Sequence, residues 1–136
     1  MITVVTGPPC SGKSTYIRER CKPGDVVIGM DRLALALSVE GTEPFEYGDV
    51  VRAVAMKARG AAVKEAVLQA QGERYLGVWI IHTDPSSDVR ASYRAMGGRI
   101  VEMDTSKAEC VARLSTRPKQ NQLIARKVID EYFAKR

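Results

Sequence analysis

The feature that most limits how this chain can fold is a glycine-rich loop near its amino end. A β-branched run, Ile2–Thr6, comes before the loop, and a segment from Lys13 to about Cys21 that favours a helix comes after it. The loop itself has the spacing G-x-x-x-x-G-K-[ST]. Its residues are Gly7, Pro8, Pro9, Cys10, Ser11, Gly12, Lys13 and Ser14. Glycines allow close approaches that a side chain would prevent, so successive backbone N–H groups can turn toward an anion. The pattern predicts a strand, a phosphate-binding loop and a helix, in that order.

Each polar residue of the loop has a physical role toward a nucleoside triphosphate. Lys13 would reach the β- and γ-phosphates, and the Ser14 hydroxyl would be offered to Mg²⁺. Thr15, the next residue on the same turn, could brace the side of the α-phosphate. The motif therefore predicts binding of ATP or GTP together with Mg²⁺. It does not distinguish kinases from ATPases or GTPases.

The rest of the chain alternates between short apolar runs and longer helical patterns. Further strands are expected at 26–30, 77–81 and 99–103, and further helices at about 32–38, 50–71, 86–96, 107–115 and 122–134. Two helices carry apolar positions that we expect to face the core: Val50, Val54, Ala58, Ala61 and Ala62 in the first, and Leu123, Val128, Ile129, Tyr132 and Phe133 in the second. Asp49 is the expected N-cap of the helix from 50, and 39–49 is an expected surface loop. The alternation predicts an α/β sandwich around a parallel sheet, with ligands at the carboxyl ends of the strands.

Length and composition narrow the possible classes. The chain has 136 residues, the size of one domain, and no apolar run approaches the ~20 residues that would cross a bilayer. Residues 1–6 lack a basic segment typical of a signal peptide. Cys10, Cys21 and Cys110 are odd in number and lack zinc-site spacing, so reduced thiols are expected. A cytoplasmic protein without a membrane partner is the corresponding hypothesis.

The positive charge is concentrated near the carboxyl end. The net charge is +5, and residues 107–136 hold eight basic against three acidic side chains, while residues 1–106 balance at 13 of each. Such a surplus favours a polyanion, either a nucleotide or a nucleic-acid backbone. A helix that only aids solubility is the alternative.

Asp31 follows the second expected strand, about 17 residues after Ser14. In a parallel sheet that strand end would face the phosphates bound by the loop. A carboxylate there could accept the proton of an attacking hydroxyl and orient it for phosphoryl transfer. The alternative role is a helix N-cap.

Two further residues follow the third expected strand. Asp84 could bind Mg²⁺ directly or through water, or it could belong to the turn before Pro85. His82 is the only histidine, and a packed or hydrogen-bonded side chain is the simpler interpretation for it. No Asp-Glu pair closes a strand, which argues against a motor ATPase.

Arg113 and Arg117 lie four residues apart in the segment after the fourth expected strand. On a helix this spacing places both guanidinium groups on one face. There they could clamp phosphates while a lid closes over the nucleotide and excludes water. A solvated helix face is the alternative.

Taken together, these residues resemble a small P-loop kinase, and more narrowly the kinase domain of bacteriophage polynucleotide kinases and their short phage and bacterial AAA-type relatives. Gly7–Ser14 matches their phosphate loop, Asp31 the aspartate that activates the acceptor hydroxyl, and Arg113 with Arg117 the arginine pair of the lid. The resemblance implies one P-loop kinase-like domain over 1–136, a three-layer P-loop NTPase sandwich. It would have a parallel sheet of four or five strands with helices on both faces, a helical lid at about 105–120 and a basic helix at about 121–135.

The function that this resemblance implies is an ATP- and Mg²⁺-dependent phosphotransferase. Its acceptor would be the 5′-hydroxyl of a polynucleotide or a nucleotide-like molecule, and its origin phage or bacterial. Two alternatives remain at this stage: a kinase for a small metabolite or nucleoside, and an ATP-binding or ATPase module that acts with a partner. The sequence assigns no oligomeric state.

Overall fold

The computed structural model describes all residues 1–136 and confirms the α/β class. The strands are β1 (Ile2–Thr6), β2 (Val26–Ile28), β3 (Val78–Ile81) and β4 (Gly98–Glu102). The helices are α1 (Lys13–Arg20), α2 (Met30–Leu37), α3 (Asp49–Gly72), α4 (Ser87–Ala95), α5 (Lys107–Ala112) and α6 (Lys119–Ala134). A 3₁₀ helix, η1 (Arg113–Thr116), connects α5 to the turn before α6.

The four strands form one parallel sheet in the order β2-β3-β1-β4. Ile2 of β1 pairs with Val78 of β3 on one side and with Gly98 of β4 on the other. All five residues of β1 are buried. A strand covered on both faces needs apolar side chains in both directions, which explains why its sequence is a nearly unbroken β-branched run.

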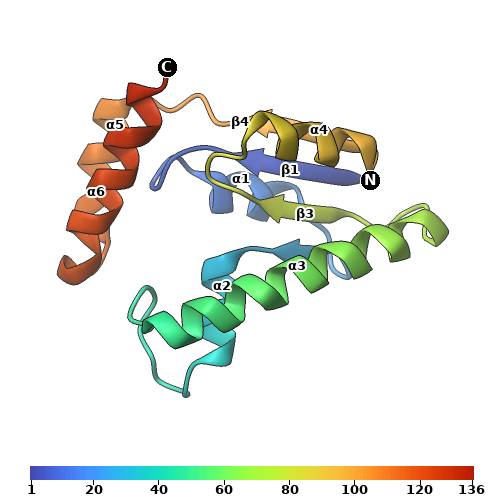
Figure 1. The fold of residues 1–136 in the computed structure, drawn as a ribbon, viewed down its shortest axis with the longest axis horizontal. Coiled ribbons are helices and arrows are strands. Elements are labelled where there is room, and N and C mark those ends of the chain that lie inside the picture. The colour runs from blue at the N-terminus through green and yellow to red at the C-terminus, as the bar shows by residue number, and fades with distance from the viewer.

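The strand order places helices on both faces of the sheet. The connection from β1 through α1 to β2 runs in one direction along the sheet, whereas the connections through α3 and α4 run in the other. Because such crossovers are right-handed, α1 covers one face, and α3 and α4 cover the opposite face (Figure 1). The helices α5 and α6 stand beyond the carboxyl ends of the strands (Figure 1). The result is the three-layer arrangement expected from the sequence, with four strands.

The main core lies between the sheet and the helices α3 and α4. It joins Val4, Val78 and Ile80 of the sheet to Val63 and Val67 of α3. A smaller cluster holds α5 and η1 against α6 through Cys110, Leu114, Ala125 and Ile129. A third cluster joins α2 to α3 through Ala34, Tyr47 and Ala55.

The apolar face expected for α3 differs in part from the buried one, although Ala62 packs against the main core. Val50 is 78% exposed and Val54 is also exposed, while the buried residues of α3 are Ala55, Val63, Ala66 and Val67. Small apolar residues occur on every side of this helix, so the periodicity alone did not select one face. Asp49 is the first residue of α3 rather than its cap, which is Gly48.

The expected apolar face of α6 was also wrong in part. Leu123 is 81% exposed, and the helix buries Asn121, Ala125, Ile129 and Tyr132. The helix begins at Lys119, before the expected start. Leu123 is two positions from Asn121, which at 100° per residue places it on nearly the opposite side of the helix. The sequence offers either Ser86 or Ser87 as the cap of α4, and in the structure the cap is Ser86, whose hydroxyl accepts a hydrogen bond from the backbone N of Val89.

No helix is both long enough and apolar enough to cross a membrane.

One carboxylate fixes the turn that leads into β2. Asp25 accepts hydrogen bonds from the backbone N of Lys22 (2.9 Å), the backbone N of Gly77 (3.0 Å) and Nε1 of Trp79 (3.0 Å). A Cβ atom on Gly77 would lie 2.5 Å from Asp25 Oδ2, so only glycine permits this approach. Burial acts to raise the pKa of Asp25, but the three hydrogen bonds outweigh it and hold the pKa below its usual value.

Replacing Asp25 with alanine is expected to lower the free energy of unfolding by about 1–2 kcal/mol, because three donors lose a charged acceptor. Since the folded-state pKa is lowered, this contribution is present above the unfolded-state pKa of about 4 and is lost as the pH falls through the folded value. Urea unfolding at several pH values measures it. Glu40→Ala, at an exposed position, serves as the control. Equal stability of the two variants at neutral pH would contradict the prediction.

Candidate functional site

The glycine-rich loop lies between the end of β1 and the start of α1, as the sequence predicted. Gly7 has φ +150° and Gly12 has φ +93°. A Cβ atom on Gly7 would lie 2.6 Å from Ser11 Oγ and 3.0 Å from Met103 Cβ. Gly12 has the room for a side chain but has a backbone conformation that favours glycine. Both glycines of the motif are therefore required by the shape of the loop.

The loop is held in place by the ends of neighbouring strands. The backbone N of Gly7 donates to the carbonyl of Thr83, after β3, at 3.0 Å. Thr105, after β4, donates its hydroxyl to the carbonyl of Ser11 at 2.7 Å. The Ser11 side chain is 1% exposed, and its Oγ has no hydrogen-bond partner. The loop thus carries an unsatisfied polar atom in a rigid frame, which is consistent with a site that receives a polar ligand.

Lys13 folds back over the loop. Its Nζ donates to the carbonyl of Gly7 at 2.6 Å and to that of Pro8 at 2.8 Å. Burial, and then the positive charge of Arg117, lowers the pKa of Lys13 to about 8, against the opposing effect of Asp31. A buried ammonium group whose hydrogen-bond acceptors are neutral carbonyls gains strongly from an anion, so the site favours phosphate binding.

A cavity of about 690 Å³ opens in front of the loop. Cys10, Ser14 and Thr15 line it from the loop and α1, and Asp31, Arg113 and Arg117 line it from the other sides. Ser14 and Thr15 are exposed. Its volume falls within the range of small-ligand sites in proteins. The structure therefore brings most of the sequence-predicted site residues to one place.

Asp31 lies in the cavity but not at the end of a strand. β2 ends at Ile28, and Asp31 is in the first turn of α2. The N-cap of α2 is Gly29, and no side chain caps the helix. The Asp31 carboxylate instead accepts a hydrogen bond from the Tyr47 hydroxyl at 3.1 Å. Asp31 was expected at the end of a strand, and this was wrong, because it lies in the first turn of the helix that follows. The side of the cleft on which Asp31 lies agrees with the prediction.

Arg113 and Arg117 both line the cavity, though not from one face of an α-helix. α5 ends at Ala112, Arg113 begins η1, and Arg117 has extended backbone. Arg113 donates to the carbonyl of Cys10 in the loop at 3.1 Å. Arg117 donates to Asn121 Oδ1 at 3.0 Å. The expected helical geometry of the pair was wrong, because the chain tightens into a 3₁₀ turn before Pro118.

Sequence reasoning missed two aromatic residues of the site, Phe45 and Tyr47. Phe45 lines the cavity and lies under the guanidinium of Arg117, 4.0 Å from its ring centroid. Tyr47 is buried and contacts Asp31. The only signal was a pair of aromatic side chains within the glycine- and acid-rich residues 39–49, for which a surface loop was expected.

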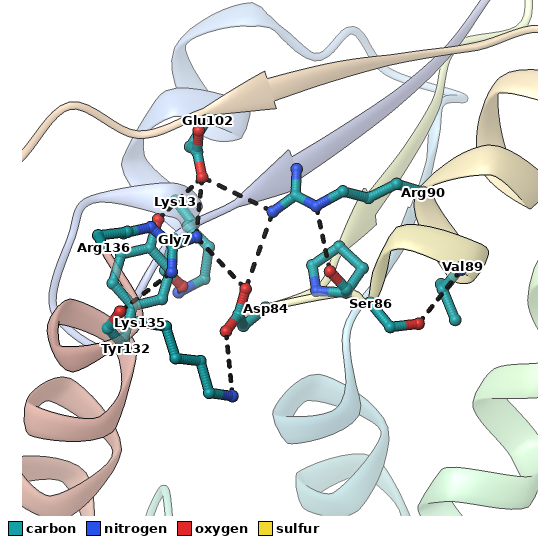
Figure 2. Close-up of polar contacts among 11 residues, drawn as sticks. Gly7, Lys13, Asp84, Ser86, Val89, Arg90, Glu102, Tyr132, Lys135 and Arg136 are labelled. Atoms are coloured by element: carbon teal, nitrogen blue, oxygen red, sulfur yellow. Dashed lines mark hydrogen bonds and ion pairs between the residues drawn. The ribbon is translucent and has the colours of Figure 1, made fainter.

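Asp84 lies in a cluster of charged groups rather than in the cavity lining. Figure 2 shows its carboxylate between Arg90, Lys135 and Arg136, at 3.8, 3.6 and 3.3 Å respectively. Glu102 shares Arg90 and Arg136, at 3.6 and 3.0 Å. No group of three or more potential metal ligands among histidine, cysteine and acidic residues occurs in the chain. Metal binding by Asp84 stays a prediction, and it would require displacing at least one of these cations.

His82 is a hydrogen-bonded side chain, as expected. Its Nδ1 lies 2.9 Å from the hydroxyl of Tyr93. Burial, followed by the charges of Arg59 and Arg90, lowers the pKa of His82 to about 4. The imidazole is therefore neutral at physiological pH.

A glycine loop after the central strand of a parallel sheet, with a buried lysine and a cavity beside it, defines a P-loop nucleotide-binding protein of the kinase or ATPase type. The sequence profile of the AAA domain family AAA_33 matches residues 2–136, and the chain belongs to this family. No curated protein matches the chain.

The residues present fit a nucleotide with Mg²⁺. The glycine loop forms a cradle that a side chain at Gly7 would fill, and Lys13 supplies the cation. The exposed hydroxyl of Ser14 is an oxygen donor of the kind that Mg²⁺ binds together with phosphates.

Replacing Arg113 with alanine is expected to weaken Mg-ATP binding about tenfold, because one charge-assisted contact to a phosphate is lost. Isothermal titration calorimetry measures this change. Arg126→Ala is the matched control, since Arg126 pairs with Asp130 on α6 and lies outside the cavity lining. Equal affinities of the two variants would contradict a role of Arg113 in nucleotide binding.

Proposed function

We propose that this protein is a phosphotransferase that moves the γ-phosphate of ATP or GTP, bound with Mg²⁺, to a hydroxyl group. The observation that carries this proposal is the arrangement around the cavity. A buried cation, Lys13, faces a carboxylate, Asp31, while Arg113 and Arg117 close a third side. A carboxylate at this place can take the proton of an acceptor hydroxyl as that hydroxyl attacks the γ-phosphorus.

Each residue of the site has a separate role in the proposed reaction. Backbone N–H groups of the loop and Lys13 hold the β- and γ-phosphates, and Ser14 helps hold Mg²⁺, which supplies charge neutralisation on the phosphates when bound. Asp31 accepts the proton of the acceptor hydroxyl as its oxygen forms the new bond to phosphorus. The bond between the γ-phosphorus and the bridging oxygen breaks, and the nucleoside diphosphate leaves. Arg113 and Arg117 stabilise the charge of the transferring group.

The first acceptor class is the 5′-hydroxyl of a polynucleotide or a nucleotide-like molecule. The similarity to phage polynucleotide kinases and the basic residues in 107–136 support it.

A small metabolite or nucleoside is the second acceptor class, and one observation favours it. Five of the eight basic side chains in 107–136 form ion pairs with carboxylates: Lys107, Arg113, Arg126, Lys135 and Arg136. Paired cations contribute less to binding an extended polyanion, because the local carboxylates already offset part of their charge.

Transfer of labelled phosphate from ATP and from GTP to a panel of 5′-hydroxyl oligonucleotides, nucleosides and small alcohols tests the proposal. Labelled product with any acceptor supports it. A steep loss of acceptor affinity with salt would favour the polynucleotide, and a flat response the small molecule. If no acceptor is labelled while a binding partner raises nucleotide hydrolysis, the protein is an ATP-binding module and the proposal is wrong.

A further inference from the structure

The carboxylate of Asp31 has one protein hydrogen-bond partner, the hydroxyl of Tyr47. The hydroxyl lies 3.1 Å from Oδ1, and no lysine or arginine is within ion-pair distance of the carboxylate. A tyrosine hydroxyl has one proton to donate. The same hydroxyl lies 3.4 Å from the backbone carbonyl oxygen of Asp31, but Oδ1 is nearer and charged, so the proton is directed to Oδ1. Oδ2 has no hydrogen-bond partner in the protein, and Asp31 lines the cavity.

The ring of Tyr47 is well placed to hold that hydroxyl still. Tyr47 is 8% exposed and packs with Ala34 of α2 and Ala55 of α3, two fully buried alanines. Asp31 is itself on α2. The Tyr47 hydroxyl and the Asp31 carboxylate are thus both held by the packed pair α2 and α3. Forming the hydrogen bond between them therefore costs little additional conformational entropy.

The residues before Tyr47 tie the same segment to the opposite wall of the cavity. Phe45 has φ +68°, an uncommon conformation for an aromatic residue, and its ring lies under Arg117. Glu46 accepts a hydrogen bond from Gln120 at the start of α6. Backbone strain of this kind is kept where the surroundings determine it, and it often accompanies function. The segment 45–47 therefore spans the two sides of the site.

We propose that Tyr47 is a positioning residue for phosphoryl transfer. Its hydroxyl orients the Asp31 carboxylate so that Oδ2 receives the proton of the acceptor hydroxyl. This inference rests on the proposed function, because it assigns Tyr47 a role through Asp31. No sequence motif marks Tyr47, and only its contact with Asp31 suggests the role.

The hydroxyl remains a donor under assay conditions. Burial, the charge of Asp31 and the hydrogen bond between them raise the pKa of Tyr47 to about 12. Both cationic and acidic groups surround this pair. The cations are Lys13 of α1, Arg32 of α2, Arg52 of α3, Arg113 of η1 and Arg117 after it, and the acidic groups are Glu19 of α1, Glu46 beside Tyr47 and Asp49 of α3.

Tyr47→Phe keeps the ring and removes the hydroxyl. We expect kcat to fall about tenfold with the KM for ATP within about twofold of wild type. Because the lost hydrogen bond favours the ionised carboxylate, the acid limb of the pH profile of kcat should move to higher pH. Tyr132→Phe is a matched control: Tyr132 is 5% exposed and donates to Glu102 at the same 3.1 Å, outside the cavity lining.

A second measurement tests the contact without the reaction. The effect of Tyr47→Phe on the unfolding equilibrium, expected at about fivefold, should become smaller when Asp31 is already alanine, because only the 3.4 Å contact of the hydroxyl with the backbone carbonyl of residue 31 remains. A wild-type kcat and pH profile in Tyr47→Phe, with phosphate transfer intact in the wild type, would overturn the inference and leave the proposed function standing. Absence of transfer by the wild type would overturn both. A loss of rate equal to that of Tyr132→Phe, with no shift of the pH profile, would reduce Tyr47 to a structural role.

Discussion

Replacing Lys13 with methionine is expected to weaken Mg-ATP binding by about 100-fold to 1,000-fold, because several charge-assisted hydrogen bonds to phosphate are lost in a buried place. Methionine keeps much of the aliphatic volume, so the loop should keep its shape. Calorimetry with Mg-ATP measures the effect. Lys64→Met, on the exposed side of α3, is the control for loss of one positive charge. Binding within tenfold of wild type would contradict the site.

The same substitution carries a pH signature in the nucleotide-free protein. Because burial lowers the pKa of Lys13 to about 8, the unfolded chain holds more protons than the folded one between pH 8 and about 10. In that window the stability of the wild type should therefore rise with pH relative to Lys13→Met. Urea unfolding of both proteins from pH 7 to 10 measures the difference. If the difference in unfolding free energy between the wild type and Lys13→Met stays constant from pH 7 to 10, the lowered pKa of a buried Lys13 is contradicted.

Asp31→Asn is expected to slow phosphate transfer by about 10²–10⁴-fold, while Mg-ATP affinity changes by less than about twofold. The amide keeps the shape of the side chain but cannot take a proton from the acceptor hydroxyl. Single-turnover transfer of labelled phosphate, with calorimetry beside it, separates these two quantities.

The matched control is Asp88→Asn. Asp88 is the second residue of α4, as Asp31 is the second residue of α2, so both substitutions remove the same favourable charge from a first helical turn. Transfer should be normal in Asp88→Asn. Should Asp31→Asn retain turnover, the proton acceptor lies elsewhere and Asp31 only supports its helix.

Much of the fold could be predicted because its signals are local. The β-branched run Ile2–Thr6 favours a strand covered on both faces, and the glycines at 7 and 12 are required by backbone angles within the loop itself. A cap at Ser86 or Ser87 was predictable for the same reason, since donor and acceptor are only three residues apart in the chain. In each case the cause and its effect lie within one short segment.

Helix faces were predicted less well, because they depend on what packs against the helix. In α3 an alanine- and valine-rich sequence offers more than one apolar side, and the contact with α2 and the sheet decides between them. In α6 the packing of Ala125 and Ile129 against α5 and η1 sets the buried side, so Asn121 is buried and Leu123 is exposed. Packing partners, not propensity, select the buried face.

The sequence by itself determined the phosphate loop and the order of strands and helices along the chain. It also indicated Lys13 and Ser14 as the phosphate and metal contacts that the experiments test. Each of these depends on chemistry within a few neighbouring positions. Only the tertiary structure decided that Tyr47 contacts Asp31, that Phe45 lies under Arg117, and that Asp84 is paired with three cations. The two residues are 16 positions apart for Tyr47 and Asp31, 72 for Phe45 and Arg117, and up to 52 for Asp84 and its cations. A pattern of neighbouring residues does not contain the folding that brings such distant positions together.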